Sequence, residues 1–189
     1  KDPLPKNVSI DDSILKITKR LPDHFLRLVD VIYVGDFEFL KEKNANATFL
    51  ENAIYITNDQ DDQNDMLDDI FHEFAHAVEK VNEYEIYSNY QGLKTDQYNF
   101  SNPNFDANLD NFLYREVGYE KIRNISSNMF LGAYSVTSLS EYFATSFENY
   151  YLNDRKMEKL ITPAVFRKLE MLNKNEEKNE TQNYYWQRK

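Results

Sequence analysis

Apolar side chains near the start of the chain are spaced as a helix requires. Residues 13–21 carry them three and four positions apart. Asp11 and Asp12 precede this stretch and are candidate N-caps, because their carboxylates can accept from the first free N–H groups of a helix. Pro22 ends the helix, since proline interrupts the hydrogen-bond ladder, and residues 23–30 begin a second helical stretch.

The next apolar runs are short and rich in β-branched residues, which is typical of strands. Residues 31–36 (VIYVGD) predict one short buried strand. Residues 47–57 predict either two strands on either side of Asn52 or one long strand with an irregularity. The acidic stretch 58–65 (NDQDDQND) predicts a solvated turn that also caps the following helix.

Helical spacing returns at residues 65–80, 138–152 and 163–172. Thr162 and Pro163 suit the start of the last of these helices, with threonine as N-cap and proline as the first helical residue. The second half of the chain is therefore predicted to be largely helical.

A long polar interval separates the first two of these helices. Residues 82–110 are rich in Tyr and Asn and weakly periodic, so we expect little regular structure there. Residues 111–125 favour a helix, and residues 126–138 favour a loop or strand. We expect one domain over residues 1–173, followed by a charged tail, residues 174–189.

The composition suits a chain that folds around its own hydrophobic core. Of 189 residues, 41% are apolar and only 4 are glycine, which argues against an all-β sandwich with many tight turns. The net charge of -10 makes nucleic acid and anionic membranes unfavourable partners, whereas neutral or basic peptides suit it. No apolar run is long enough to span a membrane, and no cysteine is present for a disulfide or thiolate metal site.

Candidate chemistry lies in residues 68–81, DDIFHEFAHAVEKV. His72 and His76 lie four apart, so on a helix they share one face and can present two imidazole nitrogens to one metal ion. Glu73 lies beside them, where its carboxylate can take a proton from a metal-bound water. The alternative is an ordinary amphipathic helix. Its apolar stripe would face the core through Leu67, Phe71, Phe74, Ala75 and Val78.

A catalytic zinc site needs a third protein ligand. His24 lies far upstream, and it fits an ordinary surface or core histidine better. Because the chain has no cysteine, the third ligand should be a carboxylate from a later helix. Glu141 is the candidate, since a glutamate among apolar neighbours must be paired or bound to something. Its alternative is a capping box with Ser138, because the two residues fit S-x-x-E at a helix start.

The segments around these residues resemble a known family. "HEFAHAV", followed by a tyrosine and by the "EYFATSF" segment that Glu141 opens, is similar to the catalytic domain of anthrax lethal factor and to the secreted Pro-Pro endopeptidases. These are small gluzincin metallopeptidases, and the resemblance covers residues 65–172. It implies that Glu141 is the third zinc ligand. It also implies that Tyr134, seven residues earlier, donates to the substrate oxyanion.

The resemblance thus implies a zinc-dependent endopeptidase that hydrolyses a protein or peptide substrate. His72, His76 and Glu141 would hold the zinc. Glu73 would act as general base towards the zinc-bound water, and Tyr134 would stabilise the oxyanion. The fold we expect is a compact α+β domain of the zincin type. In it, a small mixed sheet precedes the active-site helix and the C-terminal half is helical.

Further expectations concern the substrate and the surroundings of the zinc. Strand 47–57 would pair with an extended peptide in a cleft between the two halves, and an acidic cleft would favour basic peptides. Where the family places an acidic residue that supports a histidine ligand, this chain has Thr145; Asp69 or Glu148 could substitute. The alternative function is a zinc-binding, toxin-like or protein-interaction domain with impaired catalysis. We expect a monomer, and the resemblance favours a secreted protein.

Overall fold

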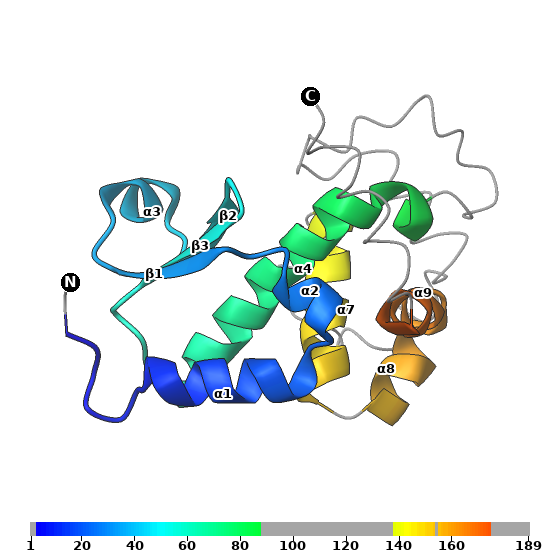
Figure 1. Ribbon diagram of the computed structural model, residues 1–189, viewed down its shortest axis with the longest axis horizontal. Helices are drawn as coiled ribbons and strands as arrows, with labels where there is room; N and C mark the ends of the chain where they lie inside the picture. The colour runs from blue at the N-terminus through cyan, green and yellow to red at the C-terminus, as the bar shows by residue number, and fades with distance from the viewer. Residues whose placement is uncertain (1–2, 88–137, 154, 175–189) are drawn as a thin grey trace.

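A three-stranded sheet lies beside a mostly helical half in the computed structural model (Figure 1). The structure describes residues 3–87, 138–153 and 155–174. α4 (Gln63–Tyr87) runs diagonally through the middle of the molecule and packs against the sheet and against α7 (Leu139–Leu152). The mixed α+β architecture with a small mixed sheet and a helical half is therefore confirmed.

The first helix begins slightly earlier than the apolar spacing predicts. α1 (Ile10–Arg20) is capped by Ser9, whose hydroxyl oxygen accepts from the N–H of Asp12 at 3.3 Å. The prediction that Asp11 and Asp12 are the N-caps is therefore wrong. Both lie in the first turn, where their charge still favours the helix N-terminus. α2 (Asp23–Leu26) is a single turn, shorter than predicted.

The sheet consists of β1 (Val31–Gly35), β2 (Ala47–Leu50) and β3 (Ala53–Thr57) in the order β1-β3-β2. β1 is parallel to β3, and β2 is antiparallel to it. Of the two alternatives predicted for residues 47–57, the structure shows two strands and not one long strand. Glu51 and Asn52 form the tight turn, both with positive φ, as two-residue hairpins favour.

A short helix that the sequence reading missed connects β1 to β2. α3 (Glu38–Lys43) ends at Asn44, which adopts the left-handed conformation with φ 50°. Asparagine tolerates this conformation at a helix end better than most residues do. Because only Leu40 is fully buried in α3, the helix gives too little apolar periodicity to be predicted from the sequence.

α4 is longer than the predicted helix 65–80. Its start is capped as expected from the acidic stretch, because the Asp62 carboxylate accepts from the N–H groups of Asn64 and Asp65. At its other end the helix continues through residues 82–87, so the prediction of irregular structure there is wrong. A kink at Asn82, with φ −115°, interrupts the periodicity and explains the error. The Asn82 side chain donates to the carbonyl of Val78 at 2.9 Å.

Three helices form the described C-terminal part. α7 confirms the helix predicted at residues 138–152, and α8 (Arg155–Ile161) was not anticipated. α9 (Pro163–Lys174) begins at the predicted proline. Thr162 precedes it, but its hydroxyl donates back to the carbonyl and the carboxylate of Glu158.

Some predictions concern residues outside the described ranges. These are the irregular structure expected over 88–110, the helix at 111–125, the loop or strand at 126–137, and the tail beyond residue 174. Tyr134 lies in this part of the chain.

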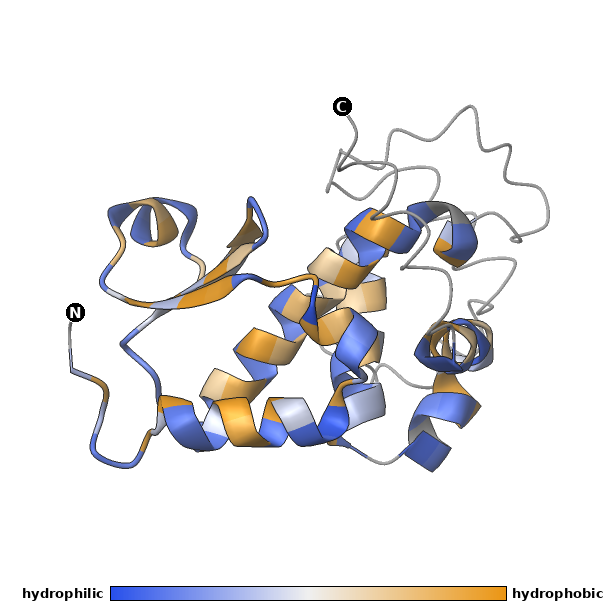
Figure 2. Ribbon diagram, viewed as in Figure 1, coloured by the Kyte–Doolittle hydropathy of each residue, from blue (hydrophilic) through white to orange (hydrophobic). Residues whose placement is uncertain are grey.

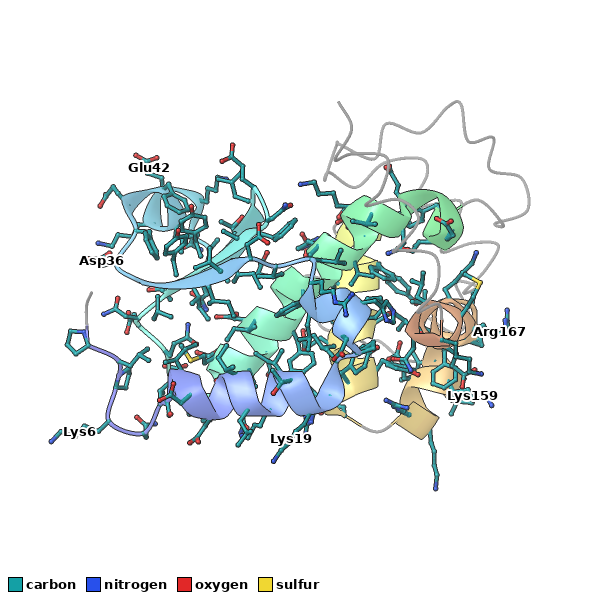
Figure 3. All side chains as sticks on the ribbon, in the orientation of Figure 1. Lys6, Lys19, Asp36, Glu42, Lys159 and Arg167 are labelled. Atoms are coloured by element: carbon teal, nitrogen blue, oxygen red, sulfur yellow. The ribbon has the colours of Figure 1, made fainter. Side chains whose placement is uncertain are left out.

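The core joins one face of the sheet to α4, α7 and α9. The predicted apolar stripe of α4 is confirmed, because its five side chains are all buried: Leu67, Phe71, Phe74, Ala75 and Val78. Figure 2 shows apolar and polar positions alternating around α1 and α4. Figure 3 shows charged side chains at the periphery, including Lys6, Lys19, Asp36, Glu42, Lys159 and Arg167. Among the described helices, none combines the length and apolar character needed to cross a bilayer.

Candidate metal centre

α4 presents two histidines and a glutamate at one place. The potential ligand atoms of His72, Glu73 and His76 all lie within 4.8 Å of one another, a grouping that could hold a metal ion. Burial of Phe71 and Ala75 fixes the rotation of the helix about its axis. The two imidazoles therefore share the face that the four-residue spacing predicts.

α7 brings Glu141 to both histidines. Its Oε2 atom lies 2.9 Å from Nε2 of His72, and its Oε1 atom lies 3.8 Å from Nε2 of His76. The two imidazole rings, with centroids 5.0 Å apart, thus turn the same nitrogen towards one carboxylate. A residue far beyond the second histidine in sequence thus completes a set of two nitrogens and one carboxylate.

The capping alternative for Glu141 holds for its backbone. The hydroxyl oxygen of Ser138 accepts from the N–H of Glu141 at 3.1 Å, so Ser138 is the N-cap of α7. The carboxylate of Glu141 instead contacts the imidazoles of His72 and His76. The same residue therefore supplies a capped N–H at the helix start and a side chain to the cluster.

The Nδ1 atoms of the two histidines face different partners. Nδ1 of His72 lies 3.7 Å from the Glu148 carboxylate. Of the two residues expected to replace an acidic side chain at position 145, Glu148 is therefore the one that lies beside Nδ1 of a histidine. The hydroxyl of Thr145 itself donates to the backbone carbonyl of Glu141. Asp69 accepts from the side chain of Gln60 at 3.2 Å instead.

Nδ1 of His76 faces a second group of side chains. It lies 3.1 Å from the Ser140 hydroxyl and 3.4 Å from the Glu79 carboxylate. Carboxylates behind both Nδ1 atoms leave the Nε2 atoms directed towards Glu141. Metal-binding histidines in proteins are usually supported in this way.

Burial and charge act in opposite directions on the pKa values in the cluster. Burial alone would lower the pKa of His72, but hydrogen bonds with Glu141 and Glu148 outweigh it and raise that pKa to about 10. Burial alone would raise the pKa of Glu141, but the same hydrogen bond and the two imidazoles lower it below its ordinary value. In the absence of a metal ion, the arrangement therefore favours an ionised Glu141 beside a protonated His72.

Glu73 has a different environment. It is only 7% exposed, and burial raises its pKa even though the nearby imidazoles and the backbone N–H of Phe49 lower it. A carboxylate whose pKa is raised accepts a proton more readily than an ordinary glutamate does, as a general base must. Phe49 belongs to β2, which pairs only with β3 in the described sheet, so Glu73 lies close to a sheet edge.

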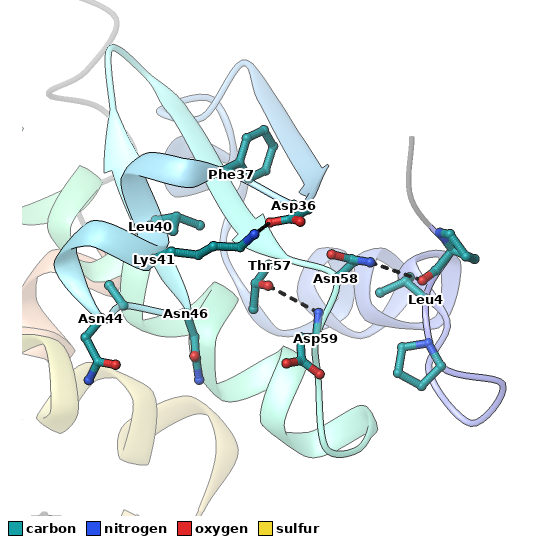
Figure 4. A pocket seen from close by; sticks show the side chains of 13 residues that line it. Leu4, Asp36, Phe37, Leu40, Lys41, Asn44, Asn46, Thr57, Asn58 and Asp59 are labelled. Atoms are coloured by element: carbon teal, nitrogen blue, oxygen red, sulfur yellow. Dashed lines mark hydrogen bonds and ion pairs between the residues drawn. The ribbon is translucent and has the colours of Figure 1, made fainter.

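A cavity of about 880 Å³ lies away from this cluster, at the carboxyl ends of the parallel strands β1 and β3 (Figure 4). Its lining includes Asp36 and Lys41, which form an ion pair at 2.6 Å, and Asn58, which donates to the carbonyl of Pro3. None of its lining residues belongs to α4 or α7. The cavity therefore does not correspond to the expected cleft at the histidine cluster.

The third histidine is separate from the cluster. His24 is buried, and its Nε2 donates to the carbonyl of Leu172 on α9 at 2.9 Å. This contact agrees with its interpretation as a core histidine.

Sequence reasoning missed three contributors to the site, namely Glu79, Ser140 and Tyr87. The sequence positions of two of them could have indicated their role. Glu79 lies three residues after His76 on the same helix, and Ser140 directly precedes Glu141. Tyr87 gave no signal, since it reaches the site only through the kinked end of α4.

Comparisons of the chain with protein families, curated proteins and solved structures find no match. The function therefore has to be inferred from the chemistry of this cluster.

Proposed function

We propose that this protein is a zinc-dependent endopeptidase of the gluzincin type. The observation that carries the proposal is the convergence of the Nε2 atoms of His72 and His76 on the Glu141 carboxylate. Two imidazoles and one carboxylate are a known ligand set for catalytic zinc, in which the fourth position is left to water or substrate.

The donor set fits zinc better than the hard cations. Imidazole nitrogen suits zinc and similar transition metals, whereas magnesium and calcium prefer oxygen ligands alone. His72, His76 and Glu141 would be the ligands. When bound, zinc lowers the pKa of its water and polarises the scissile carbonyl.

Glu73 would carry out the proton transfers. Its carboxylate belongs to the same cluster and is largely shielded from solvent. It would accept a proton from the attacking water and deliver it to the leaving amine. Tyr134 remains the proposed donor to the oxyanion.

The edge of β2 would bind the substrate backbone. The N–H of Phe49 lies close enough to Glu73 to lower its pKa, so a peptide paired along this strand would pass beside the general base. An extended protein or peptide segment is therefore the proposed substrate.

Glu73→Gln tests the proposal most directly. The variant should bind about one zinc per chain, as the wild type should, because Glu73 is not a ligand. It should lose about 10²- to 10⁴-fold in peptide cleavage, because the general base is removed. Zinc would be measured by elemental analysis after dialysis, and cleavage with a peptide library.

Two outcomes would contradict the proposal in different ways. If the wild-type protein binds no zinc, the proposal is wrong, and α4 is an amphipathic helix in which the spacing of His72, Glu73 and His76 is incidental. Zinc in both proteins with no cleavage by either would favour the alternative function, a zinc-binding domain that interacts with a protein partner.

A further inference from the structure

We propose that Glu79 is a positioning residue that fixes the tautomer of His76. The inference rests on the proposed zinc site and adds a requirement to it. A histidine can bind a metal through Nε2 only when its remaining hydrogen is on Nδ1. Something must therefore accept a hydrogen bond from Nδ1 of His76.

Four side chains form a continuous hydrogen-bonded chain at this point. The phenol of Tyr87 donates to Oε1 of Glu79 at 2.6 Å. The hydroxyl of Ser140 donates to Oε2 of Glu79 at 2.5 Å. The Ser140 oxygen also lies 3.1 Å from Nδ1 of His76.

The number of available hydrogens determines which group donates in each of these hydrogen bonds. An ionised carboxylate only accepts, so both hydroxyls must direct their hydrogens to Glu79. Ser140 has a single hydroxyl hydrogen, which is used in that bond. Its oxygen can then only accept from His76, which places the imidazole hydrogen on Nδ1 and leaves Nε2 free to bind a metal.

Burial makes this arrangement effective. The side chain of Glu79 is 12% exposed, that of His76 is 22% exposed, and Tyr87 is 4% exposed. Hydrogen bonds are stronger where water is largely excluded, and wrongly oriented ones cost more. The Tyr87 hydroxyl also lies 3.4 Å from the carbonyl of Leu139.

Replacing the carboxylate with an amide would remove the fixed direction. The side chain of Glu79→Gln offers one acceptor oxygen and one donor NH₂ group. If the NH₂ group faces Ser140, the serine hydroxyl is released to donate to Nδ1 of His76. The hydrogen then moves to Nε2, and the ligand is lost for that fraction of molecules.

The test compares Glu79→Gln with Glu85→Gln, a matched control on the same helix. Glu85 contributes its backbone carbonyl to a bond from Lys168, which this substitution leaves intact. Zn²⁺ affinity, measured by competition with a chelator, should fall about 10- to 100-fold in Glu79→Gln and stay unchanged in Glu85→Gln. The visible spectrum of the Co²⁺-loaded protein should change only in Glu79→Gln, because it reports ligand geometry.

A second variant covers the case in which Glu79→Gln does not fold. Tyr87→Phe removes one donor to Glu79 and keeps the aromatic ring, and it should weaken Zn²⁺ binding by a smaller factor. Circular dichroism of the metal-free variants would establish that they fold.

The two proposals fail in distinguishable ways. Wild-type protein that binds no Zn²⁺ would overturn the proposed function and this inference together. Wild-type protein that binds Zn²⁺, with Glu79→Gln indistinguishable from Glu85→Gln in affinity and Co²⁺ spectrum, would overturn this inference alone. If Glu79→Gln does not fold, Glu79→Ala takes its place, because it also removes the acceptor that holds the Ser140 hydrogen, and wild-type affinity in that variant would have the same meaning.

Discussion

Two glutamates in the helical half are partly or fully buried, and their pKa values move in opposite directions. Glu141 lies beside two imidazoles, and its pKa is lowered despite burial. Glu158 on α8 is 3% exposed, and burial raises its pKa to about 7, since its hydrogen bond with Thr162 offsets only part of that effect. The neighbouring groups therefore decide the direction of each pKa shift. The region around Glu141 favours an ionised carboxylate, and the region around Glu158 favours a protonated one.

Removing the carboxylate from the first region should have the largest effect. Glu141→Ala deletes a proposed ligand, so Zn²⁺ affinity should fall by more than the 10- to 100-fold typical of a supporting residue. Chelator competition would measure it, with elemental analysis after dialysis as a check. Unchanged affinity would remove Glu141 from the ligand set.

The second region should respond through stability. The folded state favours protonated Glu158, so this stabilisation is complete below the unfolded pKa of 4.5 and is lost as pH rises to about 7. Glu158→Gln should therefore be more stable than wild type at pH 8, by on the order of 2–3 kcal/mol, and much closer to it at pH 5. Urea denaturation at the two pH values would show this, and an equal difference at both would refute it.

Glu148 belongs to both regions. It lies 3.7 Å from Nδ1 of His72, and its charge contributes to the raised pKa of Glu158. Glu148→Gln should weaken Zn²⁺ binding about tenfold, at the low end for a supporting residue, because the contact is long. The same change should reduce the pH dependence of stability, and denaturation curves can detect both effects in one protein.

The smallest effect concerns Ser138, the position that precedes α7. Ser138 caps α7, so Ser138→Ala should lower the free energy of unfolding by about 1 kcal/mol. Its effect should be the same at pH 5 and pH 8, because the Ser138 hydroxyl accepts from the backbone N–H of Glu141, which does not titrate. A pH-dependent effect would show that the two regions are coupled through α7.

The fold was predictable wherever apolar spacing was regular. The hairpin, the core-facing side of α4 and the helix that carries Glu141 all follow from local patterns. α3 and α8 did not, because each is short and leaves few buried positions from which a period could be recognised. The kink at Asn82 hid the last turns of α4 for a related reason, since it shifts the register of the helix.

The candidate site divides along similar lines. The positions of His72, Glu73 and His76 follow from spacing within one helix, and in the structure the Glu141 carboxylate lies beside both histidines. The hydrogen bonds that link His76, Ser140 and Glu79 depend on how α4 and α7 pack together, which no local sequence pattern specifies. Buried polar contacts between elements are therefore the part of a site that a single sequence describes least.

The kink in α4 sets how far one side chain can reach. In a straight helix, eight residues advance about 12 Å along the axis, which would separate Tyr87 from Glu79 by more than two turns. The helix is kinked at Asn82, between these two residues. The phenol of Tyr87, at the end of the helix, donates to the Glu79 carboxylate at 2.6 Å. The non-helical residue Asn82 thus lies between two side chains that touch across more than two turns of the helix.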